Sequence, residues 1–91
     1  MKKVEIERGP TPERLKSLGV PAWPIWTHET ASFPWSYDTS ETCYFLDGDV
    51  IVTPEGGEAV QVGAGDLVTF PAGMKCTWRI LKAVRKHYRF E

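Results

Sequence analysis

From Glu41 onward the chain is divided into short segments by closely spaced turn residues. Turns rich in Gly, Pro or Asp recur about every eight residues, at 47–48, 55–57, 63–65 and 71–73. The segments between them alternate apolar and polar residues, which is typical of β-strands. We predict strands over 41–46, 49–54, 58–62, 66–70, 76–81 and 83–90. Short strands at this spacing favour an all-β sandwich or barrel.

The N-terminal part contains the signals of one short helix. Thr11 suits the N-cap and Pro12 the first helical position. Leu15 and Leu18 lie one turn apart on a common face, and Gly19 ends the helix. A helix of about two turns is unstable alone, so it must pack against the strands.

Three further strands are expected before Glu41. Residues 2–8 alternate, residues 25–29 suit an edge strand, and residues 31–37 form a better strand. Prolines exclude a central sheet position for the stretch before Ile25. One face of the third strand carries three aromatic residues, Phe33, Trp35 and Tyr37.

Length and charge limit the classes of function. A chain of 91 residues forms one domain with a single core. The net charge of −1 gives no electrostatic reason to expect nucleic acid or anionic membrane as a partner. We found no apolar run of transmembrane length and no signal peptide, which predicts a cytoplasmic protein. Cys43 and Cys76 should then be reduced thiols.

Two motifs lie within the predicted strands. Glu41 and Gly48 are separated by six residues; Gly65 is followed after five residues by Pro71-Ala72-Gly73 and then, after two more, by Cys76. Both spacings resemble those of the cupin superfamily, in which a histidine stands at the position of Cys76. The resemblance implies an RmlC-like jelly-roll barrel.

Further residues resemble one branch of the cupins. The runs Trp35-Ser36-Tyr37-Asp38 and Phe70 to Trp78, and the ending Val84 to Phe90, are similar to small single-domain cupins of the ureidoglycine-aminohydrolase and ethanolamine-utilisation type. The resemblance implies a single cupin domain over 1–91, with a strand, helix and arm over 1–22 and the barrel over 23–91. Many members of this branch have no assigned reaction, and dimers are common among cupins.

The metal ligands of the cupins are mostly missing. The resemblance implies two histidines, a glutamate and a third histidine, but the first two positions hold Trp35 and Tyr37 or, in the alternative register, Pro34 and Ser36. Glu41 alone remains as an ordinary ligand. His28 and His87 lie outside the motifs. We therefore expect no metal; if one binds, the predicted ligands are Glu41, Cys76 and Tyr37 and the metal is zinc, iron or nickel.

Each candidate residue has a functional and a structural interpretation. Glu41 suits a metal ligand, substrate anchor or general base, or a structural carboxylate held by backbone N–H groups or Tyr37. Cys76 suits a ligand or nucleophile, or a small buried hydrophobe. Cys43 shares the inward face with Glu41 and is otherwise core. The predicted catalytic residues are Glu41 and Cys76, and the predicted ligand-binding residues are Trp35, Tyr37, Glu41, Cys43, Cys76 and Trp78.

The last strand presents two different faces. Arg85, His87 and Arg89 alternate with Lys86, Tyr88 and Phe90. The simpler interpretation is a solvated basic face opposite an apolar one, and the alternative is an arginine that binds a carboxylate.

Three functions agree with these patterns. The first is binding of a small organic metabolite, a carboxylate or ureide-like molecule, beside a degenerate metal site. The second is a hydrolase or isomerase that uses Glu41 and Cys76 with a metal, or Glu41 as a metal-free acid/base. The third is a non-catalytic structural or regulatory module that forms a homodimer, for which the segment from Trp23 to Trp26 on an edge would suit the interface.

Overall fold

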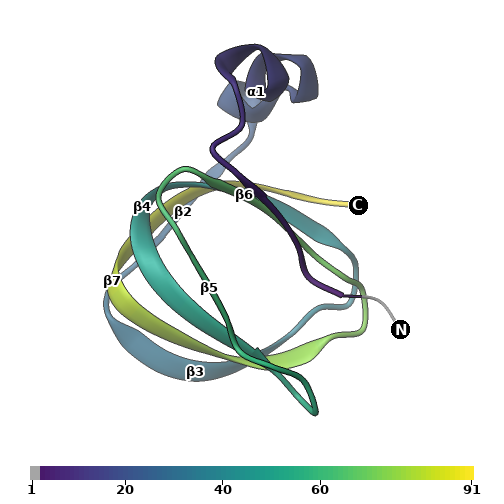
Figure 1. Ribbon diagram of the computed structural model, residues 1–91, viewed down its shortest axis with the longest axis vertical. Coiled ribbons are helices and arrows are strands. Elements are labelled where there is room, and N and C mark those ends of the chain that lie inside the picture. The colour runs from purple at the N-terminus through teal and green to yellow at the C-terminus, as the bar shows by residue number, and fades with distance from the viewer. Residues whose placement is uncertain (1–2) are drawn as a thin grey trace.

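The computed structural model describes residues 3–91 and shows one antiparallel sheet rolled into a barrel (Figure 1). Its described strands are β1 (Glu5–Arg8), β2 (Ile25–His28), β3 (Ala31–Ser36), β4 (Glu41–Pro54), β5 (Val60–Gly63), β6 (Asp66–Phe70) and β7 (Lys75–Phe90). The sheet order is β1-β6-β4-β7-β2, with β3 also paired to β7 and β5 to β4. The predicted all-β jelly roll with one short helix is confirmed.

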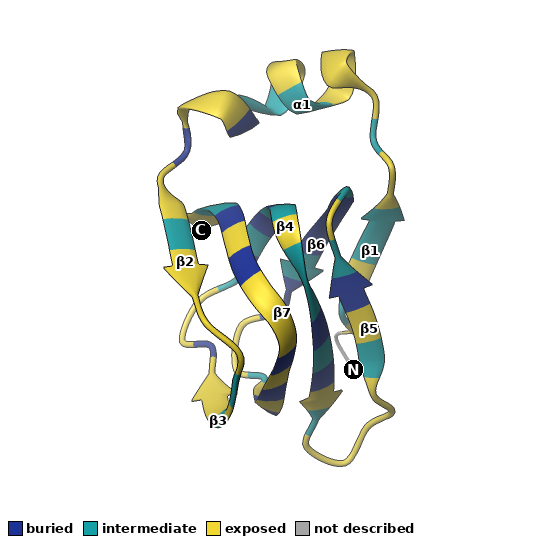
Figure 2. Cartoon of the chain, turned by 90° about the vertical axis from the view of Figure 1, so that its left-hand side faces the viewer, coloured by how far each residue is buried: buried dark blue, intermediate teal, exposed yellow. Residues whose placement is uncertain are grey.

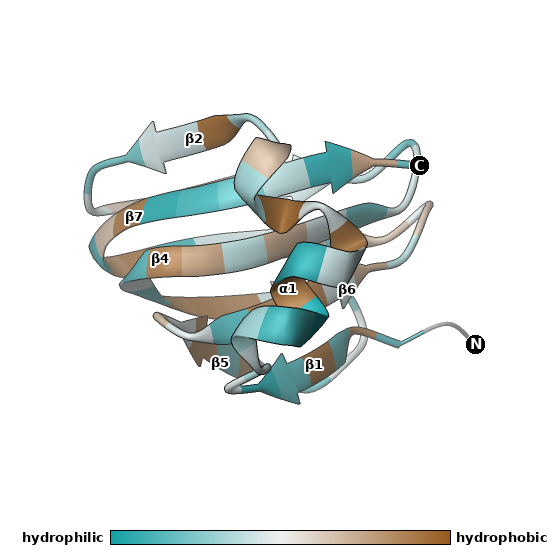
Figure 3. Ribbon diagram, turned by 90° about the horizontal axis from the view of Figure 1, so that it is seen from above, coloured by the Kyte–Doolittle hydropathy of each residue, from teal (hydrophilic) through white to brown (hydrophobic). Residues whose placement is uncertain are grey.

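The helix α1 (Pro12–Leu18) forms as its sequence predicts. The Thr11 side chain accepts a hydrogen bond from the Arg14 N–H at 3.2 Å, and Gly19 ends the helix with φ of 80°. A 3₁₀ turn, η1 (Val20–Ala22), follows. Figure 2 shows these elements across one end of the barrel. Leu15 and Leu18 pack there in a small cluster with Val20, Trp23 and Leu67, and Figure 3 shows how hydrophobic and hydrophilic residues alternate around α1.

Two long strands replace four predicted short ones. The turn predicted at Asp47-Gly48 is wrong, because β4 continues through it over 14 residues. The pairing of β4 with β7 shifts register there, which makes Gly48 part of a β-bulge. Gly48 has φ of 126°, and a Cβ on it would lie 2.9 Å from the Val84 Cγ2. Glycine therefore lets β4 bend and pass close to β7.

The break predicted after residue 81 is also wrong, since β7 runs unbroken over 16 residues and pairs with β4, β2 and β3. In the sheet, β7 lies between β4 on one edge and β2 and β3 on the other. The other predicted strands are found with their ends shifted by at most three residues, and residue 2 of the first lies outside the described part. The turn predicted around Gly73 is present, and Gly73 has φ of 82°.

The main core fills the inside of the barrel. Its most deeply buried side chains are Phe45, Val50, Val52, Val62, Val68, Phe70 and Cys43. Tyr37, in the segment after β3, and Trp78, in β7, complete this cluster. Three charged residues of the described chain are buried: Glu41 and Lys86 are 4% exposed, and Asp66 is 7% exposed.

Candidate functional site

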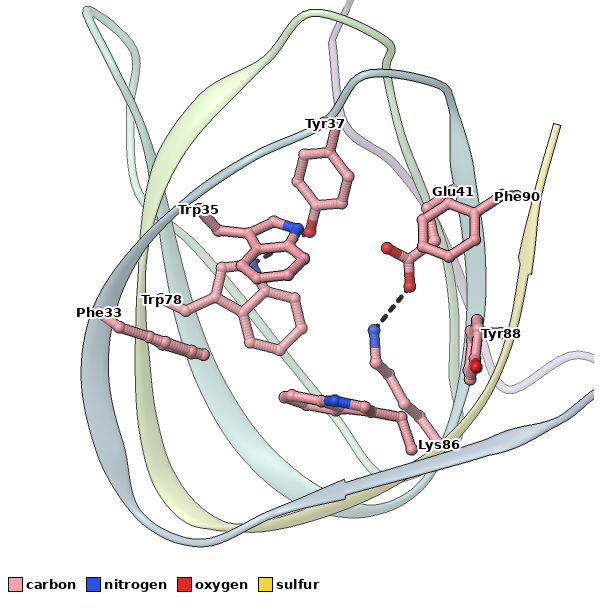
Figure 4. Close-up of a pocket in the computed structure, with 9 residues that line it drawn as sticks. Phe33, Trp35, Tyr37, Glu41, Trp78, Lys86, Tyr88 and Phe90 are labelled. Carbon is pink, nitrogen blue, oxygen red and sulfur yellow. Dashed lines mark hydrogen bonds and ion pairs between the residues drawn. The ribbon is translucent and has the colours of Figure 1, made fainter.

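A pocket of about 160 Å³ opens between β2, β3, the start of β4 and both halves of β7. Seven of its nine lining residues are aromatic and two are charged: Trp26, Phe33, Trp35, Tyr37, Trp78, Tyr88 and Phe90, with Glu41 and Lys86. Figure 4 shows these side chains turned toward one another inside the barrel. An apolar wall with a few polar groups is typical of a small-molecule site.

An ion pair forms the polar part of this pocket. The Lys86 Nζ donates to the Glu41 Oε2 at 2.8 Å, and both side chains are only 5% exposed. The Lys86 Nζ also donates to the Cys43 Sγ at 3.1 Å, and the Cys43 thiol donates to the same carboxylate oxygen at 3.0 Å. Three side chains from β4 and β7 therefore hold one another in place. Burial raises the pKa of the Cys43 thiol, which keeps it protonated at neutral pH.

The Lys86 ammonium lies against aromatic rings. Its Nζ is 5.0 Å from the centroid of the Trp26 ring and 4.9 Å from that of Trp78, within cation–π range. Burial acts to lower the pKa of Lys86, but Cys43 and Glu41 outweigh burial and raise it above its ordinary value. Lys86 is therefore a cation at neutral pH, fixed by a carboxylate and two indole faces.

Tyr37 supplies a neutral hydroxyl to the same pocket. Trp78 Nε1 donates to the Tyr37 Oη at 3.1 Å, and the Tyr37 ring stacks on Phe70 with centroids 5.0 Å apart. Burial, and then the nearby Glu41 carboxylate, raise the pKa of the Tyr37 phenol. Tyr37 thus keeps its proton, and that O–H has no acceptor among residues 3–91.

The pocket contains unused hydrogen-bonding capacity besides this O–H. Within the described chain, Glu41 accepts hydrogen bonds only through Oε2, and two of the three N–H groups of Lys86 have acceptors. Figure 4 shows the second carboxylate oxygen of Glu41 directed into the pocket, away from Lys86. Two donors and one acceptor are therefore available to a ligand.

The structure divides the predicted ligand-binding residues into two groups. Trp35, Tyr37, Glu41 and Trp78 line the pocket. Cys43 is fully buried behind the ion pair, in contact with Glu41 and Lys86. Cys76 lies outside the lining, where its thiol donates to the Trp35 carbonyl at 3.6 Å and burial raises its pKa to about 11. The expectation that both thiols face the cavity therefore differs from their observed positions.

The role of Lys86 was not predicted from the sequence. Strand alternation placed Lys86 on the apolar face of the last strand, beside Tyr88 and Phe90, and all three line the pocket. A lysine on such a face was the available signal, because an unpaired buried ammonium is costly. Its partner could not be identified, since Glu41 is 45 residues away in the chain.

The donor set does not fit a cupin metal. No group of three His, Cys, Asp or Glu side chains with metal-binding geometry occurs among the described residues. Neither imidazole lines the pocket: His87 Nδ1 lies 2.9 Å from the Trp23 carbonyl, and His28 stacks on Phe33. The one carboxylate of the pocket is already paired with an ammonium, whose charge would repel a metal ion.

Fold and pocket together define a cupin barrel, and comparison with known proteins gives its family. The sequence profile of the EutQ-like cupin domain matches residues 15–88, so the chain belongs to the EutQ-like cupin family. A DUF861 family protein from Thermotoga maritima is 54% identical over 98% of this chain and 100% of its own, with a TM-score of 0.94.

Two longer relatives share the barrel. A candidate ethanolamine utilisation protein Q from Salmonella typhimurium is 29% identical, and the EutQ protein of Clostridium difficile is 23% identical; each has a TM-score of 0.65. This chain covers 53% and 52% of their lengths, and 72% of it is aligned in each case. No curated protein matches the chain. Within the described residues, no helix has the length and apolar character needed to cross a bilayer.

Proposed function

We propose that the barrel binds a small, neutral organic molecule in the pocket between Trp35 and Lys86. The size of the pocket supports this. Its volume of about 160 Å³ is close to that of a protein cavity that holds one benzene, so the ligand has about six to ten non-hydrogen atoms. The seven aromatic rings of the wall suit a flat or apolar body.

The charges in the pocket favour a neutral ligand. Glu41 and Lys86 cancel each other, and a charged molecule would lose its hydration without gaining a free counter-ion. A carboxylate ligand would also face the open oxygen of Glu41. An amide or ureide-like group fits better, because its N–H can donate to that oxygen while its carbonyl accepts from Tyr37 or Lys86.

The observation that carries the proposal is the unused hydrogen-bonding capacity of a buried ion pair at the base of an aromatic pocket. Benzamide, an aromatic amide of suitable size, is the probe. We expect it to change the tryptophan fluorescence in a saturable way, because Trp26, Trp35 and Trp78 line the pocket. Glu41→Gln should shift this response to more than about tenfold higher benzamide concentration, and Glu29→Gln, at an exposed position outside the pocket, should not. A non-saturable response, or equal responses from the two variants, would contradict the proposal.

A catalytic role has one specific observation in its favour. The Glu41 carboxylate faces the pocket and accepts a hydrogen bond from the Lys86 ammonium at 2.8 Å. A carboxylate beside a proton donor is the arrangement that metal-free acid/base catalysis needs. Cys76, the other predicted catalytic residue, lies away from the pocket lining. A hydrolase or isomerase of this kind would therefore depend on Glu41 and lose little on Cys76→Ala, which a turnover assay of both variants would measure.

The homodimer also remains a proposal. Ile25, Trp35 and Phe90 are about half exposed, as apolar residues at an interface of subunits are when the chain is alone. Trp23 is buried and Trp26 is partly buried, so the predicted edge segment offers mainly Ile25. Sedimentation of the parent and of Ile25→Glu tests this: a dimer that becomes a monomer supports it, and a monomeric parent contradicts it. Cytoplasmic location and the absence of nucleic-acid or membrane partners stay predictions.

A further inference from the structure

Lys86 differs from the exposed lysines of its own strand in where its amine lies. Lys75 and Lys82 project from the barrel into solvent, whereas the Lys86 Nζ lies at the base of the aromatic pocket. A molecule reaches this nitrogen only by entering the pocket, since the side chain is 5% exposed. Its neighbours are a carboxylate, a thiol and two indoles.

We propose that Lys86 captures small aldehydes or ketones as a protonated Schiff base, with Glu41 as proton acceptor and counter-ion and Tyr37 as donor to the carbonyl oxygen. This rests on the proposed function, because the carbonyl compound must first enter the same pocket. It specifies the ligand class as an electrophilic carbonyl and adds a covalent step.

The groups in place balance the reaction. Glu41 takes one proton from the Lys86 ammonium, and the freed lone pair forms the N–C bond. The carbonyl oxygen, held by the Tyr37 O–H, receives a second proton from the nitrogen, which gives a neutral carbinolamine. Glu41 then returns its proton to the hydroxyl, the C–O bond breaks and water leaves. Ammonium and carbonyl have become iminium and water, and no oxidant or reductant is consumed.

The surroundings stabilise the product as well as they stabilise the reactant. The iminium keeps one positive charge and one N–H, so it retains the ion pair with Glu41 and the contacts with the faces of Trp26 and Trp78. The apolar wall limits access of water, which otherwise hydrolyses imines. Glu41 also makes the free amine scarce at neutral pH, so capture should be slow there and faster in alkaline solution.

Benzaldehyde with cyanoborohydride tests the step, because the reductant converts an iminium into a stable secondary amine. Peptide mapping by mass spectrometry then compares Lys86 with Lys82 in the same sample. We expect labelling of Lys86 to saturate with benzaldehyde concentration, to rise with pH, and at low concentration to exceed that of Lys82 about tenfold. Labelling of Lys82 should increase linearly, as for a simple bimolecular reaction.

Two variants separate the proposed roles from simple exposure of the lysine. The variants are compared in alkaline solution, where scarcity of the free amine limits the parent least. There Glu41→Gln should slow labelling of Lys86 about a hundredfold, because the proton acceptor is lost, and Tyr37→Phe about tenfold, with Lys82 unaffected in both. Circular dichroism checks that each variant is folded. Glu29→Gln is the control outside the pocket and should label like the parent.

Benzamide, which has a similar shape but does not form an imine, separates this proposal from the proposed function. Saturable benzamide binding with Lys86 unlabelled while Lys82 is labelled would overturn carbonyl capture and leave the binding function intact. Absence of both benzamide binding and Lys86 labelling would overturn both. Equal labelling of Lys86 in the parent and in Glu41→Gln would also contradict the proposed chemistry.

Discussion

Two buried carboxylates of this barrel, Asp66 and Glu41, differ in their ion-pair partners and in their positions. Asp66 is held by the Arg8 guanidinium at 2.6 Å and by the Gly63 N–H at 2.8 Å, and the Arg8 side chain is 62% exposed. Glu41 is held by Lys86, whose side chain is as buried as its own. Asp66 thus ties β1 to β6 at the surface, whereas Glu41 closes the base of a pocket.

The two ion pairs differ in how much hydration free energy their charges lose on folding. A solvated partner such as Arg8 loses little hydration, while a pair with both charges buried loses much of it and is often no more stable than an apolar substitute. The fold does not require the second kind of pair, since apolar residues could fill the same space. Its position facing a pocket supports a functional role for Glu41 and Lys86.

The largest expected difference comes from removing each cation. Lys86→Met leaves the Glu41 carboxylate buried and unpaired, and we expect it to lower the free energy of unfolding by about 3–5 kcal/mol. Arg8→Met should cost only about 0–1 kcal/mol, because its charge is solvated. Urea denaturation measures both. Equal losses would show that the two pairs are energetically alike and would break the comparison.

Removing the charge of each carboxylate separates binding from stability. Glu41→Gln should stay folded, with a lower free energy of unfolding because the buried Lys86 loses its counter-ion. It should weaken benzamide binding more than about tenfold, or about 1.4 kcal/mol, because the acceptor oxygen in the pocket is less basic. Asp66→Asn should cost about 1–3 kcal/mol of unfolding free energy and leave binding unchanged. Fluorescence titration and urea denaturation of both variants provide the measurement. Loss of binding in Asp66→Asn alone would reverse the assignment.

Alkaline pH should weaken the pocket and spare the Asp66 pair. The pKa values of Tyr37, Cys43 and Lys86 are all raised in the folded chain, so folding holds their protons more tightly. Their contribution is complete below the ordinary pKa values of 9.0 to 10.5, and it is lost as pH rises through the raised ones. The free energy of unfolding should therefore fall between about pH 9 and pH 11.

This fall has its own test in a pair of variants. The double variant Tyr37→Phe with Cys43→Ala should show a shallower decline in the urea series, because two of the protons are gone. Arg8→Met should keep the slope of the parent, since arginine does not titrate in this range. An identical slope in the double variant would mean that other groups cause the decline.

The smallest expected effect concerns the two thiols. Cys43 contacts Glu41 and Lys86, so Cys43→Ala should weaken benzamide binding by a few-fold, about 0.5–1 kcal/mol. Cys76→Ala should not change binding, because this thiol bonds the Trp35 carbonyl away from the pocket. The raised pKa of about 11 also predicts slow reaction of Cys76 with thiol reagents at pH 8. Weaker binding in Cys76→Ala would place it in the site after all.

Local patterns were enough to predict most elements of the fold. Thr11 and Gly19 set the ends of the helix, and alternation with turn residues located the strands. Asp47-Gly48 was misinterpreted because positive φ at a glycine suits both a hairpin turn and a bulge. Only the close approach of Gly48 to Val84, 36 positions along the chain, decides between them.

The candidate site was predicted only in part, because local patterns contain no long-range contacts. The motif spacing identified Glu41, and strand alternation placed Trp35 and Tyr37 together. Alternation also placed Lys86 on the apolar face of its strand. It did not predict the contact with Glu41 that gives Lys86 its role. That contact depends on the pairing of Phe45 in β4 with Lys86 in β7, a long-range register that no local pattern contains.

The most direct test of the pocket is an NMR titration that follows the four tryptophan indole N–H signals while benzamide is added. Trp26, Trp35 and Trp78 line the pocket. Trp23 packs against α1, outside the pocket, so its signal serves as an internal control. We predict saturable shifts of the first three signals in the parent and in Asp66→Asn, much smaller shifts at the same benzamide concentrations in Glu41→Gln, and a constant Trp23 signal throughout. Shifts centred on Trp23, or unchanged shifts in Glu41→Gln, would contradict a ligand site built on the Glu41–Lys86 pair.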